Sequence, residues 1–157
     1  MNSRSMILSV MREQGKTDAR QLRERAPNMD GTALIAEEQK IPLFDPQKDY
    51  SGWPIGAPVL EEVGGEMQVF GLMQPHNAAH YPSSRPSNTP ALWSIKHTKD
   101  PAKAKPWLAP SGTSGLYAKD EVCTDPAAEN PTTVYRSKVD NNAYAPSAYP
   151  PNWEIIG

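Results

Sequence analysis

The sequence predicts a mainly β protein, in which an N-terminal helical segment is followed by two small antiparallel β-modules with long loops. Two observations carry this prediction: composition changes sharply after the first quarter of the chain, and the remainder contains an internal repeat. All 17 prolines lie at or after Pro27, and every aromatic residue lies at or after Phe44. We therefore expect a helical segment at residues 1–41, modules at 42–97 and 107–157, and a solvated linker at 98–106.

The N-terminal segment has the pattern of a helix. Residues 4–25 lack proline, contain one glycine, and carry apolar side chains at helical spacing, namely Met6, Ile7, Val10 and Met11. A second short helix is expected between Asp30, which can cap its first amides, and Pro42. The apolar stripe is too narrow to stabilise a lone helix, so we expect it to pack on a partner subunit or a larger particle. The alternative is a tail that lies on its own β-domain.

The rest of the chain contains one small β-unit written twice, with a period of about 60–67 residues. Each copy has a first strand, a second strand, a polar loop with tyrosine and proline, and a closing Trp-x-Ile motif. These features lie at residues 50–59, 69–70, 81–82 and 93–95 in the first copy, and at 117–122, 134–135, 144–146 and 153–155 in the second. Gly64-Gly65 predicts a two-residue hairpin, because both turn positions need positive φ. Small duplicated modules favour multivalent binding over catalysis.

Composition argues against several function classes. The net charge is only −2, which gives no general attraction to nucleic acid or to an anionic membrane surface. No segment is apolar for long enough to cross a bilayer, so membrane insertion is not expected. The single cysteine, Cys123, rules out an intrachain disulfide and a cysteine-rich zinc site. It is expected to be a small buried side chain in a strand.

The residues that catalysis or metal binding would need do not form suitable patterns. The acidic side chains around the hairpin, at residues 61–66, suit a charged strand edge better than a glycosidase pair set across a sugar. His76 and His80 have helical spacing, but Pro75 and Pro82 oppose a helix there. We therefore predict a protein that is not an enzyme and that holds no metal or cofactor.

Several motifs together resemble a known family. The second copy carries Trp107-Leu-Ala-Pro-Ser-Gly112, the run Val-Asp-Asn-Asn at 139–142, and a closing Tyr149 and Trp153. The first copy carries Met73-Gln-Pro-His76 and Thr89-Pro-Ala-Leu-Trp93. On these motifs, residues 30–157 resemble phage proteins with tandem carbohydrate-binding modules, which are similar to the chitin-binding type 5/12 family.

This resemblance implies a non-catalytic accessory protein at the surface of a phage virion, on a tail fibre, on the baseplate, or on the head as a decoration or head fibre. Such a protein is made in the host cytoplasm and displays its modules outward, for adhesion to glycans of the host or the environment. The resemblance also implies attachment to other virion proteins through residues 1–41, and a homo-oligomer, with a trimer expected. A structural decoration or cementing protein that binds no sugar is the alternative.

The candidate sugar site lies in the loops. Sugar-binding relatives carry exposed aromatic residues just after the second strand, but those positions are His76-Asn77 and Asn141-Asn142 here, so chitin specificity is not expected. A pyranose ring offers C–H bonds on its face and hydroxyls at its edge, which suits flat rings and planar amides. The remaining candidates for carbohydrate binding are Tyr81, Tyr144, Tyr149, Trp153, Asn141 and Asn142.

Most of these candidates also have a structural interpretation. Trp93, Trp107 and Trp153 recur at equivalent places or begin a module, so they are expected chiefly in the module cores. Residues 140–142 can instead shape a turn, because Asn and Asp side chains cap local backbone and tolerate positive φ. Tyr144 and Tyr149, beside prolines in a polar loop, are open to either role.

Overall fold

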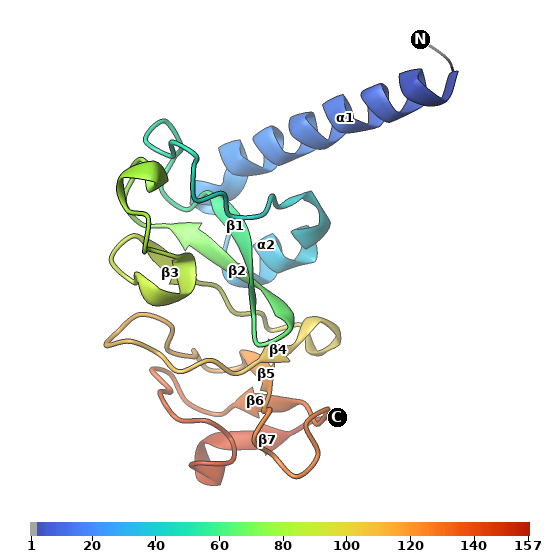
Figure 1. Ribbon diagram of the computed structural model, residues 1–157. Coiled ribbons are helices and arrows are strands. Elements are labelled where there is room, and N and C mark those ends of the chain that lie inside the picture. The colour runs from blue at the N-terminus through green and yellow to red at the C-terminus, as the bar shows by residue number, and fades with distance from the viewer. Residues whose placement is uncertain (1–2) are drawn as a thin grey trace.

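The computed structural model describes residues 3–157 and consists of an N-terminal helix followed by two small sheets (Figure 1). The helices are α1 (Ser3–Arg25) and α2 (Gly31–Ala36). The first sheet has the order β1-β2-β3, with β1 (Pro58–Val63), β2 (Glu66–Leu72) and β3 (Trp93–Ile95). The second has the order β4-β5-β6-β7, with β4 (Lys105–Pro106), β5 (Val122–Thr124), β6 (Tyr135–Ser137) and β7 (Trp153–Ile155).

The predicted order, a helix and then two small sheets, is confirmed. The description "mainly β" is too strong, because the strands are only two to seven residues long and turns and loops make up most of the chain after α2. Prolines at so many positions remove the backbone donors that longer ladders would need. The fold is therefore better described as a helix with two short-stranded, loop-rich sheets.

Helix α1 is continuous and is anchored only by its C-terminal end. Leu22 is its one buried residue among those described, and it packs in a cluster with Leu34, Ile35 and Val69. The N-terminal half extends away from the rest of the molecule (Figure 1). The alternative of a tail lying on its own β-domain is therefore wrong for this half. The expected cap of α2 is confirmed, since Asp30 Oδ1 accepts from the Ala33 N–H at 2.8 Å.

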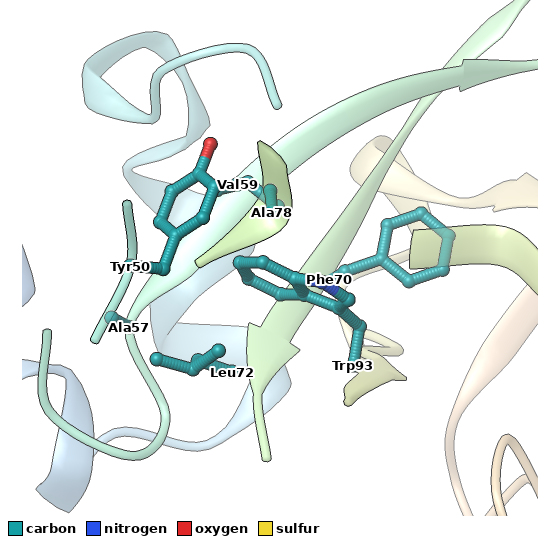
Figure 2. Packing of buried hydrophobic residues seen from close by; sticks show 7 residues of the cluster. All are labelled: Tyr50, Ala57, Val59, Phe70, Leu72, Ala78 and Trp93. Carbon is teal, nitrogen blue, oxygen red and sulfur yellow. The ribbon is translucent and has the colours of Figure 1, made fainter. Parts of the chain in front are cut away.

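The first sheet covers a core of aromatic and aliphatic side chains. Figure 2 shows the Trp93 indole in the middle of this cluster, with the Tyr50 ring beside it; the other members are Ala57, Val59, Phe70, Leu72 and Ala78. The predicted hairpin between β1 and β2 is confirmed, because Gly64 and Gly65 have φ of 63° and 88°. The hairpin aligns Val59 with Phe70, and so brings both side chains to the core face.

An equivalent backbone hydrogen bond occurs in each sheet, at the start of the first antiparallel strand. In the first sheet, the Gly56 N–H donates to Leu72 O over 2.7 Å; in the second, the Asp120 N–H donates to Ser137 O over 2.8 Å. Both donors have positive φ, 93° for Gly56 and 75° for Asp120. The chain therefore enters β1 and β5 through the same kind of turn, although only one of the two residues is a glycine.

The closing tryptophans also occupy equivalent register positions. Trp93 pairs with Leu72 across β2 and β3, and Trp153 pairs with Ser137 across β6 and β7. Both indoles are buried, and Trp107 packs against the cluster that contains Trp153. The interpretation of these tryptophans as core residues is confirmed.

A parallel edge completes each sheet. The Phe44 N–H donates to Leu60 O over 2.8 Å, and the Trp107 N–H donates to Thr124 O over the same distance at the end of β4. The predicted antiparallel pairing is confirmed for β1-β2-β3 and for β5-β6-β7, but β4, in the predicted linker, pairs in parallel with β5. The segment that enters each module runs in the direction of the first strand instead of folding back onto it through a hairpin.

Residues 98–106 are solvated as predicted only in their middle, at residues 99–103, and both ends of the segment contact the sheets. Thr98 is buried and its carbonyl accepts from the Val122 N–H at 2.8 Å. Lys105 Nζ donates to Glu38 Oε2 at 2.7 Å and to Met67 O at 2.8 Å. One of the charges that suggested solvation, Lys105, thus binds the end of the segment to Glu38, just after α2, and to β2, while residues 99–103 are exposed. Cys123 is buried in β5, as predicted.

Candidate functional site

Two tyrosines form an exposed aromatic surface on the loop between β6 and β7. Tyr144 is 57% exposed and Tyr149 is 46% exposed. Their ring centroids lie 5.5 Å apart with the planes tilted by 45°. A pair of large rings that contact each other yet remain half-exposed offers two differently oriented apolar faces to solvent.

Hydrogen bonds hold this loop in place. Trp153 Nε1 donates to Tyr144 O over 2.9 Å, and the Tyr149 N–H donates to Ala145 O over 3.0 Å. Trp153 itself is only 6% exposed. The prediction that Trp153 contacts sugar is therefore wrong, because its ring lies in the core against Tyr117 and its one polar atom is used by the loop.

Asn142 is also removed from the candidate surface. Its side chain is 1% exposed, and its Nδ2 donates to Ser137 Oγ at 2.9 Å. Its Oδ1 accepts from the Tyr144 N–H at 3.3 Å, which shapes the turn that presents the tyrosine. A buried amide with its partners satisfied contributes no edge to a ligand, so the prediction that Asn142 binds sugar is wrong and the turn interpretation holds.

Asn141 remains at the surface. It is exposed with φ of 53°, and its side chain has no hydrogen bond within residues 3–157. Asparagine tolerates this left-handed conformation better than most residues. Its amide is free to donate and accept at the rim of the same loop that carries Tyr144.

Asp125 is a supporting residue that the sequence did not reveal. It is buried, its Oδ1 accepts from the Ala127 N–H at 2.9 Å, and its Oδ2 accepts from the Ser147 N–H at 2.8 Å. Burial opposes ionisation, but the hydrogen bonds from Ser147 and Ala127 outweigh it, so the pKa of Asp125 is held below its usual value. The only sequence signal is an Asp-Pro pair typical of a turn, which says nothing of a bond to residue 147.

Tyr81 lies in the other half of the chain. It is exposed at the end of a short 3₁₀ turn, and its ring contacts His76 edge-on with centroids 5.9 Å apart. Its ring makes no contact with the Tyr144–Tyr149 pair within the described chain. The structure therefore brings together two of the three predicted tyrosines and leaves Tyr81 as a separate surface residue.

Glu121 has a structural partner, whereas the buried Nε1 of Trp107 has no hydrogen-bond partner within residues 3–157. Burial raises the pKa of Glu121, and its Oε1 accepts from the Ala118 N–H at 2.6 Å. Among residues 3–157, no group of three or more His, Cys, Asp and Glu side chains is arranged to hold a metal ion. Over the same residues, no helix has both the length and the apolarity that crossing a membrane requires.

Comparison with protein-family models, with curated proteins and with solved structures gave no match for this chain.

Proposed function

We propose that this protein is a non-catalytic glycan-binding protein displayed on the surface of a phage virion. The observation that carries the binding part of the proposal is the exposed Tyr144–Tyr149 pair on a loop fastened to the second core. The virion location rests on the resemblance of residues 30–157 to phage carbohydrate-binding proteins.

The tyrosine pair suits a sugar for physical reasons. A pyranose stacks its C–H face on a ring, and tyrosine supplies that ring with few rotatable bonds, so little entropy is lost when the ligand binds. The hydrogen bonds that the loop makes with Trp153 and Asp125 order it before the ligand arrives, which lowers the entropy cost of binding further. Asn141 adds a free amide for hydroxyl groups at the ring edge.

Oligomerisation would raise the effective affinity of such a weak single site. Support comes from an unpartnered apolar stripe on the projecting half of α1, in which Met6, Ile7, Val10 and Met11 are each more than half exposed. With Ile7 at position a of a heptad, these residues occupy g, a, d and e. This seam is broader than the a/d seam of a dimer, so we propose that α1 associates with α1 of further copies, as a trimer.

A structural decoration protein without sugar binding is the second candidate. It is favoured by the burial of Asn142 and Trp153, which leaves a smaller polar and aromatic surface than the sequence suggested. The same α1 stripe would then join the protein to other virion proteins through residues 1–41.

A glycan array separates the two candidates. We expect the full chain to bind at least one glycan, and the variant Tyr144→Ala/Tyr149→Ala to lose that binding while its unfolding transition stays unchanged. The control variant Tyr81→Ala removes one exposed tyrosine from the other sheet and should retain binding. No glycan bound at all would favour the structural candidate, whereas glycan binding that survives the double substitution would contradict the assignment of the sugar site to the tyrosine pair.

Sedimentation of the purified chain tests the oligomer. We expect a trimer that dissociates in the variant Ile7→Lys/Val10→Lys and persists in Ser9→Lys, which adds a charge on a different face of α1. A monomeric parent chain would contradict self-association.

A further inference from the structure

A basic groove runs between α1 and the loop at residues 42–53, far in the sequence from the tyrosine pair. It encloses about 510 Å³, and its walls include Lys16, Arg20 and Arg23 from α1, with Lys48 and Trp53 from the loop. The three cations of α1 are spaced i, i+4 and i+7, so they share one helix face. At the rise of an α-helix they form a row roughly 10 Å long.

The loop holds one of these cations in a fixed orientation. The Arg23 guanidinium lies over the Trp53 ring, 4.2 Å from its centroid, and Lys48 Nζ lies 5.5 Å from the same ring. A stacked guanidinium keeps its N–H donors at its edge, where they suit a carboxylate or sulfate in two-pronged geometry. Partial burial, together with the neighbouring charge of Arg20, lowers the pKa of Arg23.

The positive charge of the groove is only partly neutralised, since Glu24 acts on Arg23 through its charge without forming an ion pair with it. The side chains of Arg20, Arg23 and Lys48 have no hydrogen bond or ion pair within residues 3–157, and that of Lys16 has only an exposed contact of 3.6 Å with Glu13. Asp45 is the one acidic residue on the walls, and its Oδ1 already accepts from the Gln47 N–H. The walls of the groove therefore carry four cations and one carboxylate.

We propose that this groove binds a segment of an acidic polysaccharide, whose carboxylate or sulfate groups pair with Arg20, Arg23 and Lys48. The choice of a glycan as the polyanion rests on the proposed function. A single-stranded nucleic acid is the less suitable ligand, because its binders need a free aromatic face for each base, whereas cations cover the Trp53 ring. The groove would make the protein selective for acidic glycans.

Calorimetry with a short uronate oligosaccharide, and with the same oligosaccharide after carboxyl reduction, tests the inference on the full chain. We expect the uronate to bind at least about tenfold more tightly than its neutral counterpart, and this preference to fall as salt is raised. The variant Arg20→Gln/Lys48→Gln should lose about tenfold in affinity for the uronate. The control Lys119→Gln/Lys138→Gln removes two exposed cations of the second half and should bind like the parent.

Three outcomes would overturn the inference. They are equal affinity for the two oligosaccharides, an equal loss in both charge variants, and tighter binding of a single-stranded oligonucleotide of matched charge. The variant Tyr144→Ala/Tyr149→Ala distinguishes this site from the tyrosine site. If it still binds the uronate, the groove acts independently and the inference stands even where the tyrosine proposal fails. If it alone loses the uronate, the ligand lies at the tyrosines and the groove does not bind it.

Discussion

Tyr50 lies edge-on against Trp93, with ring centroids 5.1 Å apart and planes at 90°. The pair Tyr117 and Trp153 repeats this arrangement in the second sheet, at 5.4 Å and 70°. In each case the tyrosine precedes the first antiparallel strand and the tryptophan opens the last one. An edge-to-face contact stabilises by about 0.5–1.5 kcal/mol beyond the area it buries. The same edge-to-face contact between a tyrosine and a tryptophan therefore occurs in the core of each sheet.

Substitution of Gly31 should destabilise the protein through a single close approach. A Cβ at this position would lie 2.0 Å from His97 O, so Gly31→Ala forces α2 away from the segment after β3. We expect the free energy of unfolding to fall by about 2–3 kcal/mol in urea titrations. Gly15→Ala is the matched control, since a Cβ there meets nothing within 4 Å. In the interior of α1 it should stabilise by about 0.5–1 kcal/mol, and equal effects of the two substitutions would contradict the packing argument.

Acid should destabilise the fold through His97. Its ring is stacked on Tyr117 at 3.6 Å and its Nε2 contacts Gly115 O at 2.9 Å, while burial lowers its pKa to about 4. The unfolded chain takes up this proton near pH 6.5, but the folded chain resists it until about pH 4. The free energy of unfolding should therefore fall by about 3 kcal/mol as the pH is lowered from about 6.5 to about 4.

Urea titrations across this pH range measure the effect. His97→Phe should flatten the pH dependence, even if it lowers stability at neutral pH. An unaltered profile in His97→Phe would assign the acid sensitivity to another group.

Substitution of Trp153 should lower the stability of the fold far more than substitution of Tyr144. Trp153→Phe removes the N–H that binds Tyr144 O and leaves a gap in the second core, so we expect a loss of about 2–3 kcal/mol in stability. Tyr144→Ala changes an exposed ring and should stay within about 0.5 kcal/mol of the parent. Thermal unfolding compares the two, and a larger effect at Tyr144 would reverse the assignment of core and surface.

Asp125→Asn should loosen the tyrosine loop without altering either ring. An amide offers one acceptor oxygen where the carboxylate offers two, so either the Ala127 or the Ser147 N–H loses its partner. We expect faster hydrogen exchange at residues 144–149 and weaker glycan binding. Asp120→Asn, at an exposed position, should leave exchange in this loop unchanged; protection that persists in Asp125→Asn would show that the loop does not depend on this contact.

Local signals in the sequence were sufficient for several features. The cap at Asp30, the Gly64-Gly65 hairpin and the burial of Cys123 each depend on neighbouring residues or on simple residue preference, and each is confirmed. The candidate site was predicted less well, because exposure is not a local property. Tyr144 and Asn142 are two residues apart in one polar loop, yet one is 57% and the other 1% exposed.

The linker prediction missed the contacts at the ends of the segment for the same reason. A run of charges normally indicates a solvated segment. Here Lys105 reaches Glu38 and the carbonyl of Met67, which are 67 and 38 residues away in the chain. Pattern within the segment carries no information on such partners.

By itself, the sequence determined the helix at the N-terminus, the two short-stranded sheets and the turn residues that shape them, because these depend on spacing and on residues that adopt particular backbone angles. Tertiary structure alone decided which polar and aromatic side chains face water. Trp153 packs in the second core against Tyr117 and donates its indole N–H to the carbonyl of Tyr144, whose ring lies at the surface. It also placed Trp53 beneath Arg23, thirty residues earlier in the chain, and so created the basic groove.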